Sequence, residues 1–229
     1  MKLKDILSPS FRTFRKPRRP MVVVDSTSDW CRKMVSDGLL TEAQMQHACE
    51  RYRLGKSRSG RTIFWMLDEL GRVLDGHLGD EWVTCLLKKR EPELLRNMQT
   101  MHCLFGQHLL NLDPDESSDE GIRPVCIVGT EPSAVLLSEL LPEGLWMATV
   151  YPSNLNISSF EVLRNRDVVL FPRADPVGSY YLAAVELADQ AKRKYHMNVT
   201  VNTLLDQQAS EEQKEREIDL ADYLIENNK

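Results

Sequence analysis

The chain has 229 residues, a net charge of -5 at pH 7 with neutral histidines, and a mean hydropathy of -0.37. Its 42% hydrophobic and 28% charged residues are typical of a soluble globular protein and exclude the intrinsically disordered class, and no apolar run is long enough for a membrane span. The first residues lack the pattern of a secretory signal, and the five cysteines are odd in number, widely spaced and without a CxxC pair, so we expect a reduced, cytoplasmic protein with no membrane contact.

Residues 1–20 carry a strong positive charge. Seven basic residues against one acidic residue give +6, which leaves -11 on the rest of the chain. One interpretation is contact with single-stranded DNA or RNA, because lysine and arginine release counterions from phosphates. The alternative is a solvated leader, or one that folds back on the acidic body. Prolines interrupt residues 1–27, so we expect a basic flexible arm there. Its candidates for nucleic-acid contact are Arg12, Arg15, Lys16, Arg18 and Arg19.

Residues 28–112 are expected to form a small α+β unit. A helix should begin at Thr41, because Gln44 three residues later completes a capping box. A β-hairpin should follow, with Ile63, Trp65 and Leu67 on its first strand and a turn at residues 69–71. Residues 81–87 are a candidate third strand, and residues 21–25 a candidate short one. An acidic linker at residues 113–121 is the expected boundary between two domains.

Residues 122–229 alternate between strand and helix patterns. Short apolar runs predict four buried strands, and amphipathic stretches predict four helices between and after them. This alternation with short connections predicts an α/β domain with a mostly parallel four-stranded sheet and helices on both faces. The strands are expected at 124–129, 145–150, 167–172 and 198–205, and the helices at 131–141, 158–166, 178–196 and 210–228.

Ligands of such sheets bind at the carboxyl ends of the strands. Only Glu131 and Asp175 are acidic there, whereas a Mg²⁺ site needs at least two or three converging oxygen ligands. Glu131 falls in the first turn of its helix, where it also complements the helix dipole. Arg173 places a positive charge where a metal site requires negative charge. These strand ends are therefore poor in metal ligands, and Glu131 and Asp175 are the candidates for any catalysis.

Three blocks of the C-terminal half carry a resemblance, namely "PVCIVGTEPSAVLLSELLPEGLWMATVYPSNLN", "RDVVLFPRADPVGSYY" and "ASEEQKEREIDLADYLI". With "ERYRLGKSRSGRTIFWMLDELGRV", "EWVTCLLKK" and "HCLFGQHLL" upstream, the chain resembles the uncharacterised Toprim-domain, primase-like proteins of mobile genetic elements in anaerobic gut bacteria. The likeness covers residues 45–229. It implies a Toprim-like fold for the C-terminal domain.

The resemblance also implies where Mg²⁺ would bind. Primases, topoisomerases and nucleases of the Toprim fold use a glutamate at the end of the first strand and a DxD pair after a later strand. Gly129 stands where the glutamate is expected, and Pro132 where a lysine of the usual "VESEKTA" block is expected. The DxD position contains Arg173, Ala174 and Asp175, so only Asp175 remains as a family metal ligand.

Two further departures from the family follow from the same blocks. Val150-Tyr151 replaces the usual glycine pair before "NLN", and these larger side chains are expected to crowd the cleft. Family members often begin with a cysteine-rich zinc-binding module, whereas this chain has the basic arm.

The leading hypothesis is a catalytically inactive Toprim-like protein that binds nucleic acid or protein in the replication or mobilisation of such elements. Its partners would be single-stranded DNA or RNA at the basic arm and Arg173, or replication and mobilisation proteins. The first alternative is a divergent Mg²⁺-dependent primase or nuclease that uses Glu131 and Asp175. The second is a purely protein-interaction module, which the acidic body favours because it repels DNA. No cofactor is expected unless the enzyme alternative holds, which requires Mg²⁺.

Overall fold

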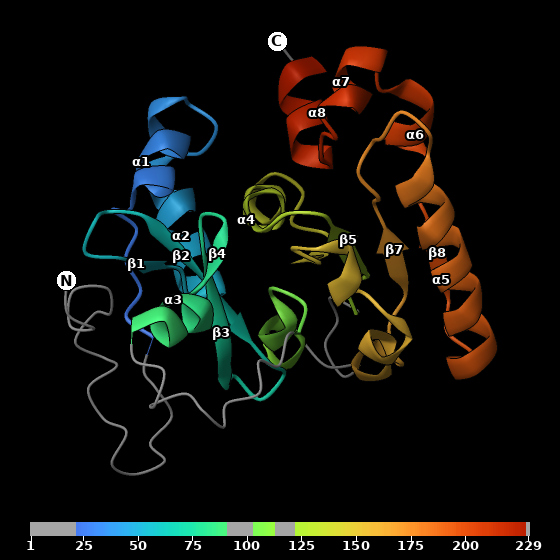
Figure 1. Cartoon of the computed structure of the whole chain (residues 1–229), viewed down its shortest axis with the longest axis horizontal. Helices are drawn as coiled ribbons and strands as arrows, with labels where there is room; N and C mark the ends of the chain where they lie inside the picture. Colours follow the sequence, from blue (N-terminus) through green and yellow to red (C-terminus); the bar gives the residue numbers. More distant parts are fainter. Residues whose placement is uncertain (1–21, 91–102, 113–121, 228–229) are drawn as a thin grey trace. The chain divides into compact units, whose positions relative to one another are not determined.

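The structure is a computed structural model that describes residues 22–90, 103–112 and 122–227 (Figure 1). The chain divides into two compact units, Met1–Cys103 and Leu104–Lys229, and each is described by itself. Among the described residues, no helix combines the length and the apolar character that crossing a membrane requires.

The described residues of the first unit form three helices and a four-stranded antiparallel sheet in the order β1-β2-β3-β4. The helices are α1 (Asp29–Ser36), α2 (Glu42–Tyr52) and α3 (Val83–Arg90). The strands are β1 (Gly55–Lys56), β2 (Thr62–Leu67), β3 (Val73–Leu78) and β4 (Glu81–Trp82).

The helix expected at Thr41 is confirmed as α2, and its capping box is complete. The hydroxyl of Thr41 accepts a hydrogen bond from the Gln44 main-chain N–H at 3.2 Å, and the Gln44 side chain accepts one from the Thr41 N–H at 3.0 Å. Two of the N–H groups that a helix start leaves without partners are thereby satisfied.

The predicted hairpin is confirmed as β2 and β3, which pair in antiparallel register. Its turn is closed by a hydrogen bond of 2.8 Å from the Gly71 N–H to the Asp68 carbonyl, with Gly71 at a φ of +71°. Every residue of β2 is buried, so both faces of this strand are covered. One face packs into the cluster of Ile63, Trp65, Leu67, Leu78 and Val83, and on the other Phe64 contacts the Trp30 ring of α1.

The third strand expected at residues 81–87 is wrong beyond Trp82, because helix α3 begins at Val83. The buried carboxylate of Asp75 accepts hydrogen bonds from the Thr84 N–H at 3.1 Å and the Thr84 hydroxyl at 2.5 Å. This interaction between β3 and the first turn of α3 favours the helix over a longer strand. Residues 22–25 form no strand, and residue 21 lies outside the described residues, as does the whole segment 1–20.

The second unit contains a parallel sheet in the order β6-β5-β7-β8. The strands are β5 (Val125–Val128), β6 (Leu145–Ala148), β7 (Val168–Leu170) and β8 (Val199–Val201). The α-helices are α4 (Glu131–Leu140), α5 (Ser179–Tyr195), α6 (Leu204–Gln208), α7 (Glu211–Glu215) and α8 (Leu220–Asn227). Three 3-10 helices are η4 (Gln107–Asn111), η5 (Pro152–Asn154) and η6 (Ile157–Leu163).

Helices cover both faces of this sheet, as the alternation predicts. The chain moves from β5 to β6 in one direction and from β6 through β7 to β8 in the other, so right-handed crossovers place α4 and α5 on opposite faces. Figure 1 shows α4 and α5 on opposite sides of β5 and β7, with α8 near α4. The α/β class with a four-stranded parallel sheet is therefore confirmed.

Three details of the second unit differ from the sequence expectation. Residues 104–112, expected in the first unit, belong to the second, because Phe105 exchanges main-chain hydrogen bonds of 2.9 and 3.0 Å with Ala148 beside β6. The final helix is broken into α7 and α8 at Glu217, which has a φ of +50°. Strand β8 ends at Val201, and α6 follows it. The linker 113–121 lies outside the described residues.

Candidate functional site

The carboxyl edge of the parallel sheet is the natural place for a site. Strands β5 and β7 are neighbours, and the chain leaves them in opposite directions, which creates a crevice outside their carboxyl ends. Gly129 follows β5, and Phe171 to Arg173 follow β7. The two positions where the Toprim resemblance expects acidic residues therefore lie at the same crevice.

Gly129 and Arg173 are packed against each other. A Cβ atom added to Gly129 would lie 2.6 Å from both Cγ and Cδ of Arg173, closer than side-chain atoms approach. The Arg173 stem therefore fills the space that any side chain at position 129 would need. Its head group is held from the other side, because Nε donates to the main-chain carbonyl of Glu217 at 2.8 Å and Nη1 lies 4.0 Å from the Glu217 carboxylate.

Asp219 supplies a third carboxylate to this edge, which the sequence interpretation missed. Its side chain is only 1% exposed and accepts from the N–H groups of Gly129 and Thr130 at 3.3 and 2.8 Å. It also accepts from the Thr130 hydroxyl at 3.0 Å and the Leu220 N–H at 2.9 Å. These donors fill the roughly four acceptor sites of a carboxylate. The sequence does contain a signal for the start of α8, which is Asp219 followed three residues later by Asp222. In the structure the Asp219 N–H donates to the Asp222 carboxylate. The prediction of one helix over 210–228 overlooked this signal.

Asp175 caps the N-terminus of α5. Its carboxylate, 7% exposed as a residue, accepts from the Ser179 N–H at 2.9 Å, the Ser179 hydroxyl at 2.7 Å and the Tyr180 N–H at 3.1 Å. Burial by itself would raise the pKa of Asp175, but the hydrogen bonds from Ser179 and Tyr180 outweigh burial and lower the pKa below its usual value. The oxygen atoms that a metal would need are directed at the helix.

Glu131 is the first residue of α4 and is 4% exposed. Its helix starts at Thr130, whose hydroxyl accepts from the Ser133 N–H at 3.4 Å. A buried carboxylate in the first turn complements the positive end of the helix dipole. The helix dipole therefore explains why an acidic residue stands at position 131, and no bound ligand is needed to explain it.

These residues do not fit a Mg²⁺ ion. Such an ion requires several oxygen atoms that converge and are free to coordinate it. Asp219 and Asp175 direct their oxygens at main-chain donors, and Arg173 adds a positive charge beside Gly129 and Glu217. Within the described part of the chain, no three histidine, cysteine or acidic side chains are grouped so that they could hold a metal.

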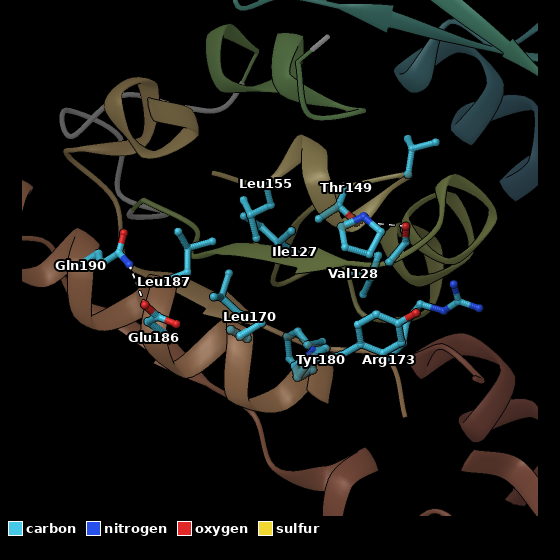
Figure 2. Close-up of a pocket in the computed structure, with 17 residues that line it drawn as sticks. Ile127, Val128, Thr149, Leu155, Leu170, Arg173, Tyr180, Glu186, Leu187 and Gln190 are labelled. Atoms are coloured by element: carbon cyan, nitrogen blue, oxygen red, sulfur yellow. Dashed lines mark hydrogen bonds between the residues drawn. The ribbon is translucent and has the colours of Figure 1, made fainter. Parts of the chain in front are cut away.

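A pocket of about 310 Å³ opens beside the same strand ends, on the face of the sheet that α5 covers. Figure 2 shows Ile127, Leu155, Leu170 and Leu187 gathered around it, with Tyr180 and Arg173 at one end and Glu186 and Gln190 at the other. The head group of Arg173 extends away from the apolar residues in this view. The volume is at the lower end of the range for small-ligand pockets, about 300–1,000 Å³.

Val150, which stands where the Toprim resemblance expects a glycine, lines this pocket in a strained conformation. Its φ is +65°, and the Tyr151 N–H donates to the Thr149 carbonyl at 2.8 Å across it. A three-residue turn with positive φ is uncommon, and for a β-branched residue it is an outlier. The backbone therefore keeps a conformation suited to glycine although the side chain has changed. The expectation that Val150 crowds the edge is consistent with its place in the pocket wall.

The nucleic-acid candidates are divided between described and undescribed residues. Arg173 lies at the pocket with 30% of its side chain exposed. The basic residues of the arm, from Arg12 to Arg19, lie outside the described residues.

Residues 76–174 match a family described as a domain of unknown function, DUF6371. The matched stretch begins in β3 and extends through β7 to the residue before Asp175. The chain is thus similar to that family across the pocket floor and Arg173. A search of curated proteins gives no match.

Proposed function

We propose that the second unit is a Toprim-like domain that binds a macromolecular partner without metal-dependent catalysis, as a component of mobile-element replication or mobilisation. The Toprim resemblance supplies the fold assignment and the biological setting. The α/β class and the parallel sheet are consistent with it. The way the carboxyl edge is filled supports the non-catalytic part of the proposal.

The observation that carries the proposal is the contact between Gly129 and Arg173 beside Asp219. An acid at position 129 would clash with the Arg173 stem, and Asp219 is saturated by internal donors. Asp175 is also directed at α5. A catalytic metal would therefore have to displace structural hydrogen bonds before it could bind.

Calorimetric titration of the full chain with MgCl₂ and MnCl₂ tests this proposal. We expect no saturable binding at micromolar metal and no nicking or primer synthesis on single-stranded DNA with either ion. Asp175→Asn keeps the size of the side chain and should behave as the wild type in both assays. Micromolar binding, or an activity that Asp175→Asn abolishes, would support the enzyme alternative with Glu131 and Asp175 and refute the proposal.

The charge asymmetry of the chain favours one further candidate function, which is contact with single-stranded nucleic acid through residues 1–20. The +6 charge there contrasts with the acidic remainder. Fluorescence anisotropy with a labelled oligothymidylate should show binding that weakens steeply with salt and disappears on deletion of residues 1–20. Unchanged binding after the deletion would exclude the arm as the contact.

A further inference from the structure

The apolar pocket exists because the first half of α5 stands away from the sheet. Of its 17 residues, Ala188 and Ala191 are the buried ones, and both lie in the second half. Ala183, Ala184 and Leu187 line the pocket. A helix over a parallel sheet normally buries a continuous apolar stripe. Here that stripe continues along the pocket wall without a partner in the described part of the chain.

Polar contacts at the start of α5 hold this spacing. Asp175 accepts hydrogen bonds from Ser179 and Tyr180, and the Tyr180 hydroxyl donates to the Glu217 carboxylate at 2.9 Å. The main-chain carbonyl of Glu217 in turn accepts from Arg173. The first turn of α5 is tied to the loop before α8, while the helix also packs along β8. The pocket is therefore preformed, which lowers the ordering cost of binding.

The lining favours an apolar occupant. Its polar side chains have internal partners, so directional recognition of a polar ligand would require breaking them. The Thr149 hydroxyl donates to the Gly129 carbonyl at 3.3 Å, and Gln190 donates to Glu186 at 3.3 Å. Tyr180 and Arg173 are held by Glu217. Most of the pocket surface is apolar, which suits one branched or aromatic side chain.

The surface around the pocket indicates a protein segment rather than an isolated small molecule. Val177 and Leu182 are 79% and 65% exposed on the loop before α5 and on α5 itself. Exposed apolar residues beside an apolar pocket, with a polar rim, are typical of a protein-interaction site.

The charge of the rim defines the partner further. Glu186 lies at the pocket, and Asp206 of α6 approaches the start of α5, with its Oδ1 3.1 Å from where a Cβ on Gly178 would lie. The one cationic side chain among the lining residues, Arg173, extends away from the apolar floor. Lysine or arginine next to the apolar anchor would complement this acidic rim.

We propose that this pocket is the docking site for a partner-protein segment that inserts one leucine, phenylalanine or tryptophan and carries basic flanking residues. The inference rests on the proposed function, because it names the partner class of a binding domain. In this inference the second unit binds its partner at the pocket beneath α5, and not at the strand ends that Gly129 and Arg173 fill.

Selection of a phage-displayed random-peptide library on the immobilised full-length protein tests the inference. Enriched peptides should share an apolar anchor with nearby lysine or arginine. Synthetic, fluorescein-labelled copies should bind in solution with micromolar Kd. Ala183→Trp fills the pocket from an exposed helix position and should weaken binding by roughly tenfold or more, the scale of an anchor residue. Lys192→Trp adds the same side chain at another exposed position of α5 that does not line the pocket, and should leave Kd within about twofold.

Two further measurements complete the test. Glu186→Gln should raise the Kd of the basic peptides by about threefold at low salt and by less at high salt. Glu211→Gln on α7 should leave their Kd unchanged. Peptides that bind wild type and Ala183→Trp equally, or an acidic consensus, would overturn the inference. Displacement of the peptide by oligothymidylate from Lys192→Trp and from the wild type alike would assign the pocket to nucleic acid instead. Metal titration is independent of these outcomes, so failure of the docking site and failure of the non-catalytic function are distinguishable.

Discussion

Asp219 is expected to be the main polar support of the carboxyl edge. Its carboxylate joins the start of α8 to the end of β5 and the start of α4, residues about 90 positions earlier in the chain. Asp219→Ala removes the acceptor of the Gly129 and Thr130 N–H groups and of the Thr130 hydroxyl. The variant therefore breaks a long-range contact without changing the apolar core.

The loss in free energy of unfolding caused by Asp219→Ala follows from the donors that lose their acceptor. Each buried donor that loses its partner costs about 1–3 kcal/mol, so the two main-chain N–H groups together give about 2–6 kcal/mol, and we expect about 3 kcal/mol. Asp219→Asn keeps one acceptor oxygen and should cost about half as much. The exposed Asp189 on α5 supplies the control, because Asp189→Ala should stay within about 0.5 kcal/mol of wild type.

Urea unfolding of the full chain, followed by far-UV circular dichroism, measures the total change. Hydrogen exchange with mass spectrometry locates it, because peptides of β5 and α4 should lose protection in Asp219→Ala while those of β2 and β3 keep it. If Asp219→Ala is as stable as Asp189→Ala and exchange in β5 is unchanged, the carboxylate does not hold this edge and the reasoning is refuted.

Three other predictions concern the same edge. Val150→Gly should stabilise the protein by about 1 kcal/mol in urea unfolding, because relief of about 1–2 kcal/mol of left-handed strain exceeds the entropy cost of glycine; a loss of stability would mean that Val150 is not strained. The pKa of Asp175 is lowered in the folded state, so the ionised carboxylate stabilises the fold above about pH 4, and this stabilisation is lost as the pH falls through the lower folded pKa. The difference in free energy of unfolding between wild type and Asp175→Asn should therefore shrink below about pH 4. A difference that grows there would contradict a lowered pKa. Gly129→Ala should cost about 1–3 kcal/mol through contact with the Arg173 stem, and less in an Arg173→Ala background; equal costs in both backgrounds would show that the two residues are not in contact.

Local patterns in the sequence predicted most of the secondary structure. The capping box at Thr41 and the hairpin of β2 and β3 depend on residues close together in the chain, and both are confirmed. Errors arose where a distant residue decides the outcome. Helix α3 replaces most of the strand expected at residues 81–87, because Asp75 of β3 accepts a hydrogen bond from Thr84 in the first turn of the helix. Phe105 joins the second unit because it pairs with Ala148, more than forty residues away.

The candidate site shows the same division between local and distant information. The positions of Gly129 and Arg173 at the ends of neighbouring strands follow from the strand pattern and from the Toprim resemblance. What fills the edge comes from Glu217 and Asp219, in a loop that the sequence assigned to the middle of one helix. No local pattern in β5 or β7 announces these contacts. The break between α7 and α8 therefore closes the carboxyl edge with internal hydrogen bonds, and it also supplies the Glu217 carboxylate that accepts from Tyr180 in the first turn of α5. The filled carboxyl edge and the end of the apolar pocket at Tyr180 therefore depend on the same loop, which is consistent with the proposed binding role of this edge.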